Sequence, residues 1–241
     1  MAVHRKICNF AVMSIMVKVN GLREAENIHD VEQLEVDLLG FVFIKDSSRY
    51  VDMISSRAGI IPDYSLLQRS GEASSQTGTS HRVGVFADEM PQTIVTRVVN
   101  ERLDYVQLDG SEQPVMIDNL RRTLDPDIRP GIQIIKTFSI GSSDDLARVA
   151  AYEGHADLFI FRIVAKEAGQ DQPVTSILDG YSGQTPFLLG GTDPDDVDFF
   201  SATRHPQFVG VDLDMRFETA PGVIDVSLLS TFIQQLKGSC R

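Results

Sequence analysis

Residues 82–108 read RVGVFADEMPQTIVTRVVNERLDYVQL, and this stretch decides the fold class. Two short β-rich runs, Arg82–Phe86 and Tyr105–Leu108, flank the segment Pro91–Arg102, which has a helical pattern of apolar residues. A strand, a helix and a second strand in this order predict a βαβ unit with parallel strands.

The same alternation continues along the chain in both directions. The β-rich runs are Met16–Val19, Leu39–Phe43, Arg82–Phe86, Tyr105–Leu108, Gln133–Thr137, Leu158–Arg162, Phe187–Gly190 and Val209–Leu213. The helical patterns are Ala25–Leu34, Pro91–Arg102, Ser142–Tyr152, Asp193–Thr203 and Val226–Lys237. An open nucleotide-binding sheet usually carries a G-x-G-x-x-G loop after its first strand, and VKVNGLR has none. Eight strand–helix units in 241 residues predict an α/β fold, a single-domain (β/α)8 TIM barrel.

The sequence also predicts where the barrel begins and which segments are added to it. Residues 1–15 form an N-terminal extension in this interpretation, and residues 16–241 form the barrel. The small, polar stretch Ser70–Ser80 is typical of a loop. Strand–helix units continue on both sides of it, so we interpret it as an insertion within one repeat rather than a domain linker.

Composition and charge limit the classes of partner. The formal net charge is −12, which argues against nucleic acid or an anionic membrane as a general partner. A small phosphorylated anion remains compatible, because a few local donors can hold one phosphate. No apolar run approaches the roughly 18 residues of a membrane span. The two cysteines and the scattered histidines suggest neither a disulfide framework nor a metal site. We expect a cytoplasmic protein without a cofactor, either a monomer or a weak homodimer.

Four segments carry a more specific signal. GFVFIKDSSRYV (residues 40–51), RVGVFADE (82–89), DYVQLDG (104–110) and GVDLDMRFETAPGVID (210–225) occur in this order at the spacing of a barrel. Together they resemble the phosphoribosylanthranilate isomerases of tryptophan biosynthesis, over about residues 17–237. The resemblance implies an Amadori rearrangement of N-(5′-phosphoribosyl)anthranilate to 1-(2-carboxyphenylamino)-1-deoxyribulose 5-phosphate. No cofactor is needed for this reaction.

The chain departs from that family at both proton-transfer positions. The family's base is a cysteine in K-x-C-G at the end of the first strand, and its acid is an aspartate at the end of the sixth. Here these positions hold Asn20 and Arg162. An amide does not titrate near neutral pH, and a guanidinium stays protonated. Because each acid–base group contributes about 10²–10⁴-fold to a rate, we expect weak or lost activity.

Several binding positions follow from the same resemblance. For the substrate these are Lys18, Arg49, Gln107 and Asp109, with Arg49 facing the anthranilate carboxylate and Asp109 replacing a histidine. For the phosphate they are Gly190, Gly191, Asp214 and Met215. A carboxylate beside a phosphate is repulsive, so Asp214 weakens the expected phosphate site. The strand-six loop, Ala165–Ser176, lacks the glycine-rich segment of the family.

The residues leave other interpretations open. Asn20 is either a ligand-binding amide or, in our preferred reading, a neutral filler. For Arg162 we prefer an internal ion pair with Asp109 or Asp214 over a new anion site. Arg49 either binds a ligand carboxylate or pairs with a loop acid. As a whole, the chain is a slow isomerase, a non-catalytic ligand-binding or regulatory protein, or a different isomerase or lyase with Asp109, Asp88 or Asp214 as its base.

Overall fold

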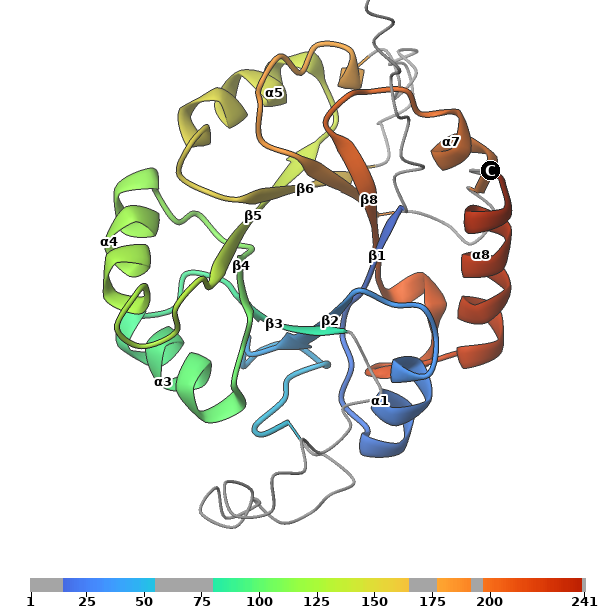
Figure 1. Cartoon of the computed structure of the whole chain (residues 1–241), viewed down its shortest axis with the longest axis horizontal. Helices are drawn as coiled ribbons and strands as arrows, with labels where there is room; N and C mark the ends of the chain where they lie inside the picture. The colour runs from blue at the N-terminus through green and yellow to red at the C-terminus, as the bar shows by residue number, and fades with distance from the viewer. Residues whose placement is uncertain (1–14, 55–79, 165–176, 192–196, 240–241) are drawn as a thin grey trace, which may run out of the picture.

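Eight parallel strands close into a barrel in the order in which they occur along the chain (Figure 1). A computed structural model describes residues 15–54, 80–164, 177–191 and 197–239. The strands are β1 Met16–Val19, β2 Leu38–Val42, β3 His81–Phe86, β4 Tyr105–Leu108, β5 Gln133–Ile140, β6 Leu158–Ile163, β7 Phe187–Gly190 and β8 Phe208–Leu213. The predicted (β/α)8 barrel is confirmed, and its closure is made by β1 pairing with both β2 and β8.

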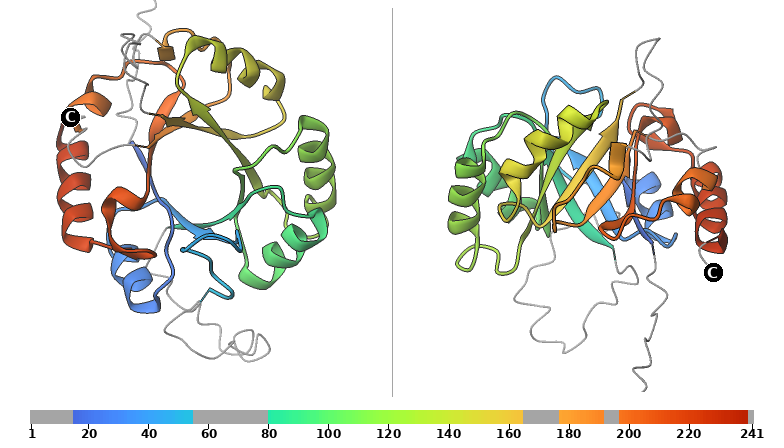
Figure 2. Two further views of the ribbon diagram at one scale, coloured as in Figure 1. Left: turned by 180° about the vertical axis from the view of Figure 1, so that it is seen from behind. Right: turned by 90° about the horizontal axis from the view of Figure 1, so that it is seen from above.

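Helices cover the outside of the barrel, and Figures 1 and 2 show the ring of strands from its two ends. They are α1 Ala25–Glu32, α3 Pro91–Glu101, α4 Pro114–Leu124, α5 Ser143–Val149, α7 Val197–Ala202 and α8 Val226–Ser239, with a 3₁₀ turn η1 at Ala150–Tyr152. A capping box between Ser142 and Asp145 starts α5, as the Ser/Asp sequence there suggests. Helix α4 was not predicted.

A short appendage follows the last barrel strand. The 3₁₀ turn η2, Met215–Phe217, leads into an antiparallel pair of β9, Glu218–Ala220, and β10, Val223–Ile224. None of these elements was predicted from the sequence. They carry Glu218 back toward the open end of the barrel, where the candidate site lies.

Two apolar clusters form the core. The larger lies between strands and helices and includes Val17, Phe161, Phe187 and Phe232. The smaller consists of strand residues that fill the barrel interior, namely Leu38, Val83, Ile135, Leu158, Ile160 and Leu188. Branched apolar side chains are the usual filling of such a barrel, so its interior is a packed core and not a pore.

Some predicted segments lie outside the described residues. These are residues 1–14 of the extension, nearly all of the Ser70–Ser80 loop, the whole of Ala165–Ser176 and the beginning of the predicted helix Asp193–Thr203. Within the described ranges, no helix has the length and apolar character needed to cross a membrane.

Candidate active site

Four polar side chains meet at the end of the barrel where the parallel strands terminate. Asn20, Asp109 and Asp214 directly follow β1, β4 and β8, and Arg162 lies near the end of β6. All four line one cavity of about 260 Å³. Its other described lining residues are Gly21, Val42, Ile44, Ser47, Arg49, Val85 and Met215. Enzymes of this fold place their active sites at this end.

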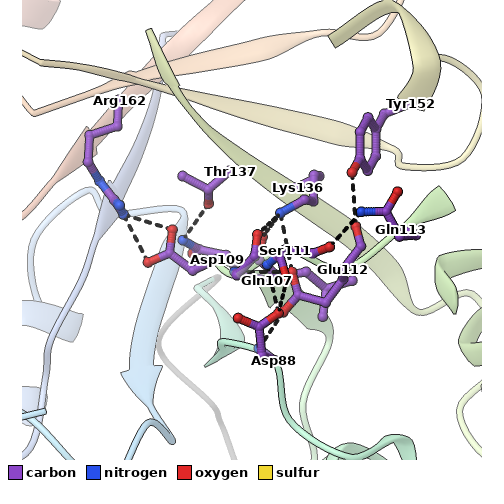
Figure 3. A network of polar contacts seen from close by, with 12 residues as sticks. Asp88, Gln107, Asp109, Ser111, Glu112, Gln113, Lys136, Thr137, Tyr152 and Arg162 are labelled. Atoms are coloured by element: carbon purple, nitrogen blue, oxygen red, sulfur yellow. Dashed lines mark hydrogen bonds and ion pairs between the residues drawn. The ribbon is translucent and has the colours of Figure 1, made fainter. Parts of the chain in front are cut away.

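Arg162 and Asp109 form an ion pair inside the cavity. The Nη2 atom of Arg162 lies 3.1 Å from the Asp109 carboxylate, and Figure 3 shows the two side chains facing one another. Burial disfavours the charge of Arg162, but nearby Asp109, Asp212 and Asp214 outweigh it and raise the pKa of the guanidinium. Arg162 therefore keeps its proton, and the internal pair that we preferred from the sequence is found.

Asn20 is held by its own turn. Its backbone N–H donates to the Leu213 carbonyl on β8, and its side-chain Oδ1 accepts from the N–H of Gly21 at 3.0 Å. Gly40 on β2 makes room for this side chain, since a Cβ there would lie 2.5 Å from the same oxygen. The amide therefore has a structural role at the position of the family's base, whatever it offers a ligand.

Arg49 is paired with a carboxylate that the sequence did not single out. Its Nε and Nη2 atoms each donate to Glu218, at 2.6 Å, so the pair is bidentate. Hydrogen bonding to Glu218 raises the pKa of Arg49. The Glu218 side chain is 4% exposed and that of Arg49 is 22% exposed. Arg49 thus faces the cavity while an internal acid fixes its orientation.

Lys18 and Gln107 lie one layer deeper than the cavity. Each precedes a cavity residue by two positions, and side chains two apart on a strand point to the same side. The Lys18 ammonium is fully buried and donates to Asp212 at 2.6 Å. Gln107 donates to Thr137 at 3.1 Å. Neither lines the cavity, so direct contact of these two residues with a ligand stays a prediction.

The loop after β4 is fixed by a buried lysine (Figure 3). Lys136 on β5 donates to the carbonyls of Leu108, at 3.2 Å, and Gly110, at 2.7 Å. It also lies 3.2 Å from Glu112, which itself accepts from the N–H groups of Asp88 and Gly110. These contacts hold the backbone of Leu108 and Gly110, the two chain neighbours of Asp109. They therefore fix the position from which Asp109 pairs with Arg162.

Asp88 takes part in this loop network and not in the cavity. Its carboxylate accepts from the backbone N–H and the hydroxyl of Ser111, both at 2.7 Å. These hydrogen bonds lower the pKa of Asp88. An exposed, readily ionised carboxylate away from the cavity is a poor candidate for the base that the sequence left open at this position.

The predicted phosphate residues lie around the ends of β7 and β8. Gly191 has a φ of +75°, and a Cβ there would lie 2.6 Å from the Ile163 carbonyl, so a side chain does not fit. The Gly191 carbonyl accepts a hydrogen bond from Arg216, which brings a positive charge to this end. Asp214 and the exposed Met215 both line the cavity, whereas Gly190 and Gly191 are outside its lining.

The surroundings of Asp214 disfavour its charged form. Burial raises its pKa, and the nearby charge of Asp212 raises it further. The opposing contributions of Arg216 and Arg162 are smaller.

Within the described ranges, no group of three or more His, Cys, Asp or Glu is arranged to hold a metal ion.

Sequence reasoning missed two partners that shape the site, Glu218 and Asp212. Both lie in the segment GVDLDMRFETAPGVID that carried the resemblance. Asp212 was detectable, because parallel pairing of the first and last strands of a barrel places it beside Lys18. Glu218 lies beyond the last barrel strand, and no periodicity signals its contact with Arg49.

Comparisons with known proteins agree with this architecture. The family model of N-(5′-phosphoribosyl)anthranilate (PRA) isomerase matches residues 17–235. The PRA isomerase of Phocaeicola vulgatus is 35% identical over 226 residues, which are 92% of this chain and 98% of that protein. The enzyme of Parabacteroides distasonis is 33% identical over 225 residues, covering 92% and 93% of the two chains.

Solved structures show the same fold. A PRA isomerase in complex with reduced 1-(o-carboxyphenylamino)-1-deoxyribulose 5-phosphate superposes with a TM-score of 0.68 at 24% identity, over 93% of this chain and 99% of the other. The enzyme from Thermotoga maritima gives a TM-score of 0.67 at 23% identity with the same coverage. The family model matches most of the chain, and curated members of the family are similar to it over nearly the same range. The chain therefore belongs to the N-(5′-phosphoribosyl)anthranilate isomerase family.

Proposed function

We propose that this protein binds N-(5′-phosphoribosyl)anthranilate at the open end of its barrel and isomerises it slowly, as a divergent isomerase of tryptophan biosynthesis. The observation that carries the proposal is the ion pair of Arg162 with Asp109, in the same cavity as Asn20. The cavity lies at the strand ends, where enzymes of this fold place their active sites, and the two positions that the resemblance assigns to proton transfer hold groups that do not titrate near neutral pH.

The chemistry explains why the rate suffers. The reaction needs an acid that protonates the ribose ring oxygen as the ring opens, and a base that takes the C2′ proton of the resulting Schiff base. Asn20 has no proton-accepting group for the second step. Arg162 holds its proton tightly in the field of Asp109, which disfavours donation in the first. Each substitution is expected to cost about 10²–10⁴-fold in rate.

Ligand recognition is better preserved than catalysis. A guanidinium has five N–H donors, and Glu218 takes up two of those on Arg49. A further donor, on Nη1, lies 3.5 Å from the Ser48 hydroxyl, which leaves two N–H donors for the anthranilate carboxylate of a ligand in the cavity. For the phosphate, the turn at Gly190–Gly191 and the nearby charge of Arg216 are favourable, and Asp214 is unfavourable.

Two measurements test this proposal. The gene is expressed in a tryptophan auxotroph that lacks its own isomerase, beside the intact relative from Phocaeicola vulgatus. We expect growth well below that of the relative, and equal growth would contradict impaired catalysis. Calorimetry with the reduced product analogue tests binding, with Arg49→Ala as the comparison variant. We expect binding below millimolar concentration that weakens in the variant, and no heat at millimolar ligand would refute the binding function.

A further inference from the structure

The barrel mouth contains one carboxyl group that the family comparison does not explain. Asp214 directly follows Leu213, the last residue of β8, and its side chain lines the cavity. Asp212, two residues earlier on the strand, is buried and pairs with Lys18 below the cavity.

Charged groups from several elements face this carboxyl. Arg162 comes from β6, Arg49 from the loop after β2, Asp212 from β8 and Arg216 from η2, and each interacts electrostatically with Asp214. Its direct hydrogen bond, from the backbone N–H of Arg216, is long at 3.4 Å. Among the described residues, Asp214 is therefore surrounded by charge without a close ion pair, and burial and the nearby charge of Asp212 raise its pKa.

The other carboxyl in the cavity, that of Asp109, already forms an ion pair with Arg162. Among the described residues that line it, the carboxyl groups are those of Asp109 and Asp214. Asp109 already accepts a hydrogen bond from the Arg162 guanidinium at 3.1 Å. Asp88 is bound to Ser111 outside the cavity. A proton-transfer group needs both access to the reacting atoms and an energetically accessible second protonation state. Of these three carboxyls, Asp214 best meets both requirements.

We propose that Asp214 is the catalytic acid–base residue of this protein, in place of the two groups substituted at Asn20 and Arg162. The inference rests on the proposed function, since it requires N-(5′-phosphoribosyl)anthranilate in the cavity. One carboxyl suffices because the reaction first consumes a proton and then releases one.

The proposed steps balance. The Asp214 carboxyl donates its proton to the ribose ring oxygen as the C1′–O bond breaks, and the nitrogen lone pair forms the C1′=N bond of the Schiff base. The Asp214 carboxylate then takes the proton from C2′. The C–H electron pair forms a C1′=C2′ bond, and the C=N electrons return to nitrogen. The resulting enol loses its hydroxyl proton to water and gains one at C1′, which gives the ketone product. Asp214 ends protonated, as it began.

The test compares Asp214→Asn with Asp30→Asn, which removes an exposed carboxylate on the outer helix α1. Conversion of N-(5′-phosphoribosyl)anthranilate is measured with enzyme in excess, across pH, for both variants and the parent. We expect Asp214→Asn to lose about 10²-fold or more of the rate and the pH dependence due to this carboxyl. Asp30→Asn should keep the parent rate. A partial recovery in Asp214→Glu would separate proton transfer from mere packing.

Calorimetry with the reduced product analogue distinguishes the two ways of failing. We expect Asp214→Asn to bind it about as tightly as the parent, because the amide keeps the size and the hydrogen-bonding capacity of a protonated carboxyl. If the parent binds the analogue but Asp214→Asn converts substrate at the parent rate, the role of Asp214 is wrong and the proposed function stands. If the parent binds but converts nothing above the buffer rate, both the role of Asp214 and the slow isomerisation are wrong, and only the binding part of the proposed function stands. If the parent does not bind, the proposed function itself fails.

Discussion

Arg49 and Glu218 form a bidentate ion pair across the barrel mouth, with both hydrogen bonds at 2.6 Å. Gly21, in the turn after β1, lies against both side chains. A Cβ at Gly21 would be 2.9 Å from the Cδ of Arg49 and 2.9 Å from the Oε1 of Glu218. The segments that follow β1, β2 and β8 are thus in contact at this one point, which sets the direction of the cavity's arginine.

This contact makes Gly21→Ala a sensitive substitution. Gly21 has a φ of +84°, which costs an alanine about 1–2 kcal/mol, and displacing the ion pair should add about 1–3 kcal/mol. Gly154→Ala is the matched control, since its φ is +80° and a Cβ there meets nothing within 4 Å. Urea unfolding should show a clearly larger loss for Gly21→Ala. Equal losses would mean that the Arg49–Glu218 pair adapts freely.

The buried pair of Lys18 and Asp212 predicts a strong asymmetry between single and double substitutions. Lys18→Met leaves the Asp212 carboxylate buried without a counter-charge, which should cost about 3–5 kcal/mol of unfolding free energy. Adding Asp212→Leu removes the uncompensated charge and should recover much of this loss. Urea unfolding of both variants checks it. A single substitution that costs below about 1 kcal/mol would indicate that water or another cation reaches Asp212.

The sequence predicted the barrel because strand periodicity is local. The bounds of β1, β4 and β7 agree with the predicted runs, and the other strands differ by a few residues at their ends. Helix α4 was missed because it begins at Pro114, directly after the short loop that follows β4. The hairpin of β9 and β10 was missed because its strands are too short for an alternating pattern.

Several cavity residues and the pairing of Arg162 with Asp109 were predicted from the sequence, but the other contacts of the site were not. Once a parallel barrel is known, strand-end residues such as Asn20, Asp109 and Arg162 must meet at one end. The partner of Arg49 was not predictable, because Glu218 is 169 positions away and lies outside the repeat. The sequence did not predict the depth of Lys18. Two residues along a strand span about 6.6 Å, which places Lys18 one layer below the cavity residue Asn20.

The ion pair of Arg162 and Asp109 determines how family activity could be restored. Asn20→Cys with Arg162→Asp reintroduces both family side chains, but it also places a new carboxylate against Asp109 without the guanidinium. Two carboxylates this close cannot both ionise freely. Adding Asp109→His, the residue type that the sequence resemblance implies at that position, removes the conflict. We expect the triple variant to exceed the parent in kcat/KM by about 10²-fold or more, and the double variant to fall short of it. Equal values for the double and triple variants would show that Asp109 does not oppose the restored acid.

The raised pKa of Asp214 predicts that its removal stabilises the protein at neutral pH. The folded protein binds the Asp214 proton more tightly than the unfolded chain does, because burial and Asp212 disfavour the charged form. This group's contribution to stability is therefore fully present below the unfolded pKa of about 3.9 and is lost as the pH rises through the higher folded value. Asp214→Asn avoids that loss, so its free energy of unfolding should exceed that of the parent at pH 7 and approach it near pH 3.

Asp88→Asn provides a control of opposite sign. Hydrogen bonds from Ser111 lower the pKa of Asp88, so its carboxylate contributes stability above the unfolded pKa and loses it as the pH falls through the folded value. Asp88→Asn should not stabilise the protein at pH 7. Urea unfolding of the parent and both variants at pH 7, 5 and 3.5 measures the two trends. If Asp214→Asn is no more stable than the parent at pH 7, its carboxylate is not disfavoured in the folded barrel. Binding of the substrate alone would then have to raise the pKa of Asp214 enough to give the protonated form that its acid role requires.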